Sequence, residues 1–167
     1  KVDGANAAVH FVDGRLTLQS RGHVLTGGAR ERIFGRFKPW AYEREPELRR
    51  ILGERYVAYG EWCYAKNRIF YDALPDYFIE FDVFDKEQGR FLTTPARQAL
   101  LQGGPLTSVA ILHQGACHKA PAFTSCADVS RYKTGRWRDK YKAAMKGALG
   151  RHYADSETDA RLLMEGA

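Results

Sequence analysis

Two runs of alternating apolar and polar residues, 7–12 and 15–20, open the chain with Asp13-Gly14 between them. An Asp-Gly pair between such runs is a strong signal for a two-residue β-hairpin turn. That turn fixes which residues pair across the hairpin and which face of the sheet each one occupies. The expected pairs are Phe11 with Leu16 and Val9 with Leu18 on an apolar face, and Asn6 with Arg21, Ala8 with Gln19 and His10 with Thr17 on a polar face.

The remaining pattern predicts short strands and short helices, as in an α+β domain with largely antiparallel sheets. Proline in the first turn and glycine after the last residue indicate a helix over 46–52, and Thr94-Pro95 indicates an N-cap and a first helical residue. The predicted elements are strands over 55–62, 67–72, 77–85 and 106–113, helices over 46–52, 94–102 and 136–149, a turn over 86–89 and irregular chain over 115–129.

The predicted strand over 77–85 carries two acids among aromatic and β-branched residues. Strict alternation places Glu80 and Asp82 on the same face as Phe78 and Phe84. Acids on an apolar face cost free energy unless they are paired or bound to a cation. Either these two acids have such a partner, or they face water at the edge of a sheet.

Residues 30–44 combine basic with aromatic side chains. Nucleobases stack on aromatic rings while phosphates pair with arginine and lysine, so this segment could line a nucleic-acid groove. The alternative is a surface helix whose aromatic residues face the core. The residues concerned are Arg30, Arg32, Arg36, Lys38 and Arg44, with Phe34, Phe37, Trp40 and Tyr42.

A second basic segment lies near the end of the chain. Eight lysines and arginines fall between Arg131 and Arg151, against the single acid Asp139. A solvated helix usually mixes its charges, so we favour phosphate contacts for this segment. The candidate residues are Arg131, Lys133, Arg136, Arg138 and Lys140.

Composition narrows the class of protein. The chain has 167 residues and a net charge of +6, and no apolar run approaches the roughly 20 residues of a membrane span. Its three cysteines lack a C-x-x-C spacing and its five histidines are scattered, so neither a disulfide framework nor a zinc site is expected. We expect a cytoplasmic protein with a polyanionic partner and no membrane association.

The first six residues, Lys1-Val2-Asp3-Gly4-Ala5-Asn6, carry the main candidate chemistry. A lysine is a nucleophile only as the neutral amine, so a cation, a metal ion or desolvation must lower its pKa from about 10.4. The glycine allows a tight turn or a close approach to a ligand. The predicted hairpin returns Ser20-Arg21-Gly22 beside this hexad, which predicts a site. Taken alone, K-x-D-G is a weak pattern that favours a strand ending in a lysine and an Asp-Gly turn.

Five motifs follow one another along the chain: K-x-D-G-x-N at 1–6, S-R-G at 20–22, Y-G-E-W at 59–62, E-F-D-V-F at 80–84 and M-E-G at 164–166. This series resembles the motif set of the covalent nucleotidyltransferases, which comprise polynucleotide ligases and mRNA capping enzymes. Asn6 and the spacing to Arg21 resemble the ATP-dependent RNA ligases most, in particular the RNA-ligase-2-like group. Ser130-Arg131-Tyr132-Lys133-Thr134 before a basic helix resembles bacterial members.

The resemblance implies a nucleotidyltransferase fold, with helices outside antiparallel sheets that form a nucleotide cleft. It also implies an ATP-dependent RNA ligase that forms lysyl-AMP with Mg²⁺ or Mn²⁺, transfers the AMP to an RNA 5′-phosphate and seals with a 3′-hydroxyl. The implied roles are Lys1 as nucleophile, Asp3, Gly4, Asn6, Arg21 and Glu61 as nucleotide contacts, Phe81 and Asp82 as the adenine wall, Glu165 as metal ligand, and Arg131, Lys133, Arg136, Arg138 and Lys140 as RNA contacts.

Part of the family's pattern is not found in residues 1–167. The family's site ends with a strand that carries two phosphate-binding lysines, and another strand leads into the nucleophile. We therefore expect a single adenylyltransferase domain cut at both ends, monomeric, that binds nucleotide poorly by itself. The alternatives are a non-catalytic nucleotide- or RNA-binding module of this fold, an mRNA capping guanylyltransferase that uses GTP, and a DNA ligase.

Overall fold

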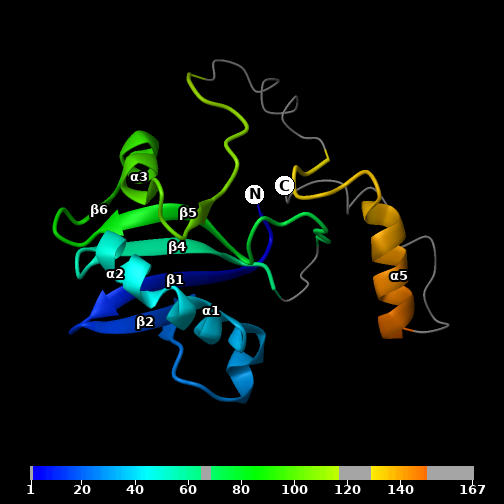
Figure 1. The fold of residues 1–167 in the computed structure, drawn as a ribbon, viewed down its shortest axis with the longest axis horizontal. Coiled ribbons are helices and arrows are strands. Elements are labelled where there is room, and N and C mark those ends of the chain that lie inside the picture. Colours follow the sequence, from blue (N-terminus) through cyan, green and yellow to red (C-terminus); the bar gives the residue numbers. More distant parts are fainter. Residues whose placement is uncertain (1, 65–68, 117–128, 150–167) are drawn as a thin grey trace. The chain divides into compact units, whose positions relative to one another are not determined.

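The computed structural model describes residues 2–64, 69–116 and 129–149. The chain divides into two compact units. The sheet unit consists of Gly4–Ala65 and Asp76–Val109, and the C-terminal unit consists of Lys1–Asp3, Lys66–Pro75 and Ala110–Ala167. Figure 1 shows the described elements of both.

A single sheet of seven strands forms the centre of the sheet unit, in the order β3-β2-β1-β4-β5-β6, with β7 paired to β5. Every pair is antiparallel except β5 with β7. The sheet and its helices confirm the predicted α+β class. The strands are β1 (Ala5–Val12), β2 (Arg15–Ser20), β3 (His23–Val24), β4 (Tyr56–Trp62), β5 (Phe78–Asp85), β6 (Arg90–Phe91) and β7 (Thr107–Ser108).

The opening hairpin has the predicted register. Val12 pairs with Arg15 across the turn, and the other predicted pairs from Phe11–Leu16 to Ala8–Gln19 follow. Asp13 and Gly14 have φ values of 49° and 70°, as a type I′ turn requires at both central positions. The local turn chemistry therefore determines the pairing of β1 with β2.

The helices of the sheet unit bury their apolar side chains against one face of the sheet. Phe37 is fully buried, and the centre of its ring lies 4.9 Å from that of Trp62 and 5.4 Å from that of Phe78. Burying one such side chain contributes about 1.5–3 kcal/mol. In Figure 1, α1 and α2 lie beside β1 and β2. The helices are η1 (Ala29–Phe34), α1 (Phe37–Glu43), α2 (Glu45–Leu52) and α3 (Thr94–Leu101).

The predicted helix boundaries hold to within one or two residues. Helix α2 has proline in its first turn and ends at Gly53, whose φ is 49°. Helix α3 begins at Thr94, so Thr93 rather than Thr94 is the N-cap residue. In the C-terminal unit, α5 (Trp137–Leu149) confirms the predicted basic helix. None of the described helices is both long and apolar enough to cross a membrane.

One predicted strand is wrong, and another is much longer than the strand that forms. Residues 69–72, the described part of the predicted strand over 67–72, form no strand. The predicted strand over 106–113 is reduced to β7, because its two residues pair only with Ile79 and Glu80 of β5. From Ala110 onwards the chain belongs to the C-terminal unit. Most of the predicted irregular segment, residues 117–128, lies outside the described residues.

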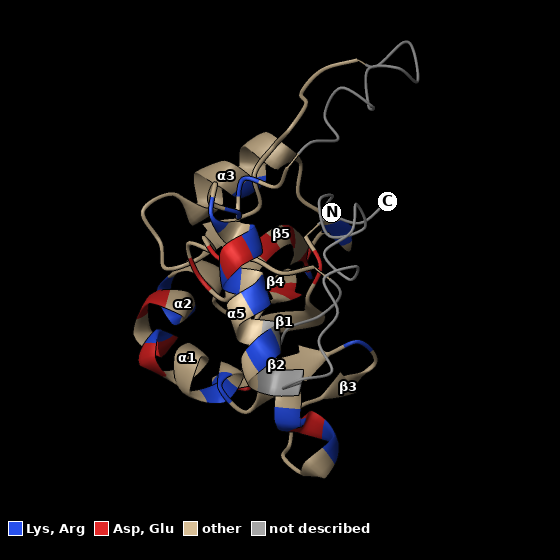
Figure 2. Ribbon diagram, turned by 90° about the vertical axis from the view of Figure 1, so that its right-hand side faces the viewer, with Lys and Arg blue, Asp and Glu red and all other residues tan. Residues whose placement is uncertain are grey.

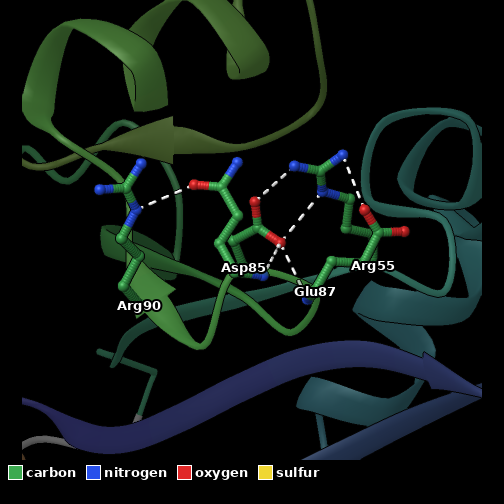
Figure 3. A network of polar contacts seen from close by, with 5 residues as sticks. Arg55, Asp85, Glu87 and Arg90 are labelled. Atoms are coloured by element: carbon green, nitrogen blue, oxygen red, sulfur yellow. Dashed lines mark hydrogen bonds and ion pairs between the residues drawn. The ribbon is translucent and has the colours of Figure 1, made fainter.

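A polar network fixes the predicted turn between β5 and β6 (Figure 3). The Asp85 carboxylate has no exposed surface and accepts hydrogen bonds from Arg55 Nε at 3.0 Å and Nη2 at 2.6 Å. The backbone amides of Glu87 and Gln88 donate to the same carboxylate. The bonds from Arg55 hold the pKa of Asp85 below its usual value, so this acid stays ionised and the turn stays closed at neutral pH.

Candidate nucleotide site

The sheet face opposite the helices carries polar motif residues. Asn6 of β1 lies directly opposite Glu61 of β4 in the antiparallel ladder. Ala5 and Ala7, on either side of Asn6, and Trp62, next to Glu61, all pack in or against the core, so alternation turns Asn6 and Glu61 to the other face. Glu61 is 3% exposed. Residues from two motifs that are distant in the sequence thus meet at one point of the sheet.

Gly4 packs against the end of β4. A Cβ atom at this position would lie 2.8 Å from the Trp62 carbonyl oxygen and 2.9 Å from the Cys63 Sγ. The φ of Gly4 is not in the left-handed region. The glycine of the first motif is therefore required by the close approach of two backbones, and it fixes the entry into β1 beside the Asn6–Glu61 pair.

Arg21 lies in the two-residue turn between β2 and β3 and is exposed. The β1–β2 ladder ends at the pair Ala7–Ser20, one residue before the predicted pairing of Asn6 with Arg21. The S-R-G motif nevertheless returns to the beginning of β1, as predicted. The role of Arg21 as a nucleotide contact stays a prediction.

Strand β5 contains a β-bulge at Phe81. Tyr59 pairs with Asp82 whereas Gly60 pairs with Glu80, so Phe81 is an extra residue opposite β4. Alternation shifts by one residue here, and the prediction that Glu80 and Asp82 share a face is wrong. Because Val83 belongs to the core, its neighbour Asp82 lies on the polar face. Bulges of this kind are frequent beside active sites.

The carboxylate of Glu80 is fully buried and binds Arg97 of α3. Arg97 Nη1 donates to both carboxylate oxygens at 2.9 and 3.0 Å, and Ser108 Oγ of β7 donates at 2.7 Å. Burial raises the pKa of Glu80, and the bonds from Ser108 and Arg97 oppose that rise. The expectation of a cationic partner is confirmed for Glu80, and exposure to water is excluded. Arg97 belongs to no motif, so the sequence predicted that Glu80 needs a partner but not which residue it is.

The half-buried Asp82 is less acidic than an exposed aspartate. Burial raises its pKa, while the hydrogen bond from the Val83 amide and the charge of Arg97 oppose the rise. An acid whose ionised form is poorly solvated favours a hydrogen-bond donor or a cation beside it. Asp82 therefore has the chemistry of a contact residue on the polar face.

Gly60, in the Y-G-E-W motif, does not open space for a ligand. A Cβ at this position would lie 2.6 Å from the Phe78 ring and 2.7 Å from the Ile79 carbonyl oxygen. The space beside Gly60 is therefore filled by the protein itself. The missing side chain makes room for the Phe78 ring, which packs on Trp40 and Phe37.

The aromatic residues of the segment 30–44 belong largely to the core. Phe34, Phe37 and Trp40 are 5%, 0% and 7% exposed. Tyr42 is 58% exposed. The interpretation as a helix with an aromatic core face is confirmed for the first three, which are not accessible for stacking on nucleobases.

In the C-terminal unit the S-R-Y-K-T motif is tied to Asp72. The carboxylate accepts hydrogen bonds from the Thr134 amide at 2.7 Å, from the Thr134 hydroxyl and from Lys140 Nζ at 2.9 Å. Burial opposes ionisation of Asp72, but these bonds outweigh it and hold its pKa below the usual value. The backbone amides of Asp72 and Ala73 donate to the Tyr132 carbonyl oxygen, so the motif has a rigid backbone.

The five candidate RNA contacts occupy different environments. Lys133 is 8% exposed with Nζ 4.2 Å from the centre of the Trp137 ring. Arg138 lies over the same ring, and Lys140 pairs with Asp72 as described above. Arg131 and Arg136 are exposed and form no ion pair with a described residue. Their roles in RNA binding stay predictions.

Lys1 and Glu165 lie outside the described residues, and their roles stay predictions. Asp3 follows Lys1 in the C-terminal unit, and its backbone amide donates to Tyr71 Oη at 2.8 Å.

A hard divalent cation that arrives with a nucleotide prefers oxygen ligands. Within the described part of the chain, no group of three or more His, Cys, Asp or Glu side chains is arranged to hold a metal ion. Magnesium commonly uses one or two carboxylates together with substrate phosphates and waters.

The sheet is covered by helices on one face and carries polar motif residues on the other. This is the fold of a ligase adenylation domain. The sequence profile of the RNA ligase family, described as "RNA ligase", matches residues 1–166. The chain belongs to the RNA ligase family. No curated protein matches the chain.

Solved structures of Naegleria gruberi RNA ligase share the fold. A variant with ATP and Mn is 20% identical, with a TM-score of 0.56 over 77% of this chain and 40% of that chain. The structure with PPi is 21% identical, with a TM-score of 0.56 over the same shares. An apo variant is 21% identical, with a TM-score of 0.58 over 80% and 41%. The present chain thus spans about 40% of the length of these proteins.

Proposed function

We propose that the protein is an ATP-dependent RNA ligase. In the first step the amine of Lys1 attacks the α-phosphorus of ATP, a nitrogen–phosphorus bond forms and pyrophosphate leaves. The AMP then passes to an RNA 5′-phosphate, and attack by a 3′-hydroxyl joins the ends and releases AMP. The observation that carries this proposal is the pairing of Asn6 with Glu61, which joins the first and third motifs of an RNA ligase family member on one polar sheet face.

Each candidate residue would have its own part in holding the nucleotide. Glu61 would accept hydrogen bonds from the ribose hydroxyls, while Asn6 and Asp3 position the sugar and the lysine. Arg21 would pair with the ribose or a phosphate, since a guanidinium matches phosphate geometry. Phosphoryl transfer asks the protein mainly for positioning and charge neutralisation, and these side chains supply both.

The bulge of β5 would form the adenine wall. Phe81 is half-buried at the bulge, and a ring of this kind stacks on any purine face. Asp82 next to it supports the wall from the polar face. Solved Naegleria RNA ligase structures contain ATP or AMP with Mn, which supports a nucleotide and a divalent metal here. A bound Mg²⁺ or Mn²⁺ would neutralise phosphate charge, and Glu165 is the candidate ligand.

The basic residues of the C-terminal unit would contact RNA. Arg131 and Arg136 present exposed charge, whereas the burial of Lys133 and the Lys140–Asp72 ion pair favour roles in ordering the segment. The proposed partners are ATP and RNA with 5′-phosphate and 3′-hydroxyl ends, for a monomeric cytoplasmic enzyme.

The first test is covalent labelling of the longest natural form of the protein with α-labelled ATP and Mg²⁺. We expect a covalent label on the wild type that survives denaturation and alkali and is released by acid, since a lysine phosphoramidate is formed and the pyrophosphate is lost. Lys1→Ala removes the nucleophile, so labelling should vanish. Lys146→Ala removes an exposed lysine of α5 and should label as the wild type does.

Parallel reactions separate the alternatives. Labelling by GTP in place of ATP would indicate a capping enzyme, and sealing of DNA ends in preference to RNA ends would indicate a DNA ligase. An unlabelled wild type that still binds ATP or RNA would identify a non-catalytic module. Label that persists in Lys1→Ala contradicts the assigned nucleophile.

A further inference from the structure

In the 3₁₀ helix η1, buried residues recur every three positions and the arginines lie between and after them. Glu31 and Phe34 are buried, whereas Arg30 and Arg32 are exposed, and so is Arg36 just after the turn. A 3₁₀ helix has three residues per turn, so residues three apart share a side. In Figure 2 the helical turn after β3 is blue on both sides of its single red residue.

The backbone of this turn is fixed by the core. The Ile33 carbonyl oxygen accepts a hydrogen bond from Trp62 Nε1 at 2.9 Å. The carbonyl oxygens of Arg32 and Arg36 accept bonds from the amides of Gly35 and Trp40. Because Phe34 is also buried, the exposed arginines are mounted on a rigid support rather than on a free loop. Such a support lowers the cost of ordering a binding surface.

The only acid of the turn is already neutralised. Glu31 accepts hydrogen bonds from the amides of Thr26 and Gly27 at 3.0 and 2.7 Å, and it pairs with Lys38 at 3.3 Å. Burial opposes ionisation of Glu31, but the bonds from Gly27, Lys38 and Thr26 outweigh it and hold its pKa below the usual value. Its charge is therefore directed inward, away from the arginines.

The three exposed arginines lack the acidic partners that several other arginines of the sheet unit have. Arg44, Arg49 and Arg55 each pair with an acid. Within the described part of the chain, Arg30, Arg32 and Arg36 form no ion pair. Their positive charge is uncompensated, and an anion with repeated charges along a flexible backbone complements it.

We propose that Arg30, Arg32 and Arg36 form a contact surface for the phosphodiester backbone of RNA, distinct from the nucleotide face of the sheet. The identity of the polyanion rests on the proposed ligase function. Guanidinium groups bind phosphate in a bidentate manner. Phe34, the ring between these arginines, and Phe37 just after them are buried in the core. The proposed contact is therefore made by the arginines with the RNA backbone and is independent of RNA sequence.

The test measures RNA affinity against salt concentration in the absence of ATP. Fluorescence anisotropy with a 5′-phosphorylated RNA, single-stranded and as a nicked duplex, gives the slope of log K against log salt. Each phosphate contact contributes roughly 0.7–0.9 to that slope. The variant Arg30→Ala/Arg32→Ala/Arg36→Ala should therefore lose about 2 to 3 from the slope and bind roughly tenfold or more weakly near 0.1 M salt.

A charge-matched control removes three exposed arginines from elsewhere on the sheet unit. Arg15→Ala/Arg50→Ala/Arg90→Ala lowers the net charge equally and should retain most of the wild-type slope. An Arg→Lys variant at the three proposed positions keeps the charges and should keep the slope. An unchanged slope in the first variant, an equal loss in the control, or a wild type without RNA binding overturns the proposal.

The same variants distinguish this contact from the ligase chemistry. Labelling by ATP alone involves no RNA, so the variant that lacks Arg30, Arg32 and Arg36 should label as the wild type does. An unlabelled wild type that still loses RNA affinity in this variant would refute the ligase function and leave the RNA surface standing. A loss of labelling in this variant would place these arginines in nucleotide binding and overturn the assignment to RNA.

Discussion

Glu80 shows how one buried charge can organise its surroundings. Its carboxylate has no exposed surface and receives bonds from Arg97 of α3 and Ser108 of β7. The three side chains join a helix and a second strand to β5 immediately before the bulge at Phe81. Removing one partner of a buried ion pair costs more than replacing both, because the remaining charge is left unsolvated.

Arg97→Met should destabilise the protein by about 3–5 kcal/mol at pH 7. Burial already raises the pKa of Glu80 above 4.5, and loss of Arg97 raises it further. An acid with a raised folded-state pKa loses stability as pH rises from its unfolded value towards its folded value. The loss measured by urea unfolding should therefore be smaller at pH 5 than at pH 7.

The matched control is Glu80→Gln combined with Arg97→Met, which leaves no ionisable group at this position. It should recover part of the stability at pH 7 and remove the difference between the two pH values. A destabilisation of Arg97→Met that is equal at pH 5 and pH 7 contradicts the assigned role of the Glu80 charge.

At the scale of secondary-structure elements, features set by the local sequence could be predicted, whereas features set by contacts between distant residues could not. The β1–β2 hairpin follows from Asp13-Gly14 and the alternation beside it, since the turn conformation depends on those residues alone. The bulge at Phe81 lies opposite the step from Tyr59 to Gly60, where the Phe78 ring occupies the space beside the glycine. The short β7 depends on which residues of β5 are free to pair with it. Neither the bulge nor the short length of β7 is visible in a local sequence pattern.

Gly60→Ala tests the close approach of β4 and β5. The added methyl would lie 2.6 Å from the Phe78 ring and 2.7 Å from the Ile79 carbonyl oxygen, so strands or core must shift. Overpacking of this kind costs roughly 1–3 kcal/mol or more, and thermal unfolding should move down by several degrees. Gly135→Ala is the control, because nothing lies within 4 Å of its added Cβ. Equal stability of the two variants would contradict the close approach.

For the whole chain, the order of the motifs could be identified from the sequence, but the contacts between distant segments could not. The order of motifs led to the RNA ligase family and to its fold, because each motif is short and local. The joining of Asp72 to Thr134 and Tyr132 is a contact between distant segments. Residues 67–72 had the pattern of a strand, so their part in the C-terminal unit was missed.

The division into two units predicts a local effect of Asp72→Ala. The Thr134 amide would lose its acceptor and Lys140 its partner, at a cost of about 1–3 kcal/mol. Hydrogen exchange should accelerate by roughly 10- to 100-fold at Thr134 and its neighbours, while the amides of β1 and β4 keep their protection. Asp139→Ala, at an exposed position of α5, should change neither. Equal acceleration in β1 would show that the two units open together.

The positions of the three tryptophans allow each unit to be followed by intrinsic fluorescence. All three indole rings are buried, Trp40 and Trp62 in the sheet unit and Trp137 in the C-terminal unit. Emission from a buried indole shifts to longer wavelength when water reaches it. Replacing Trp137 by phenylalanine would leave a signal from the sheet unit alone, and replacing the other two would leave the complementary signal. The loosening of each half can thus be followed by fluorescence without attaching a dye.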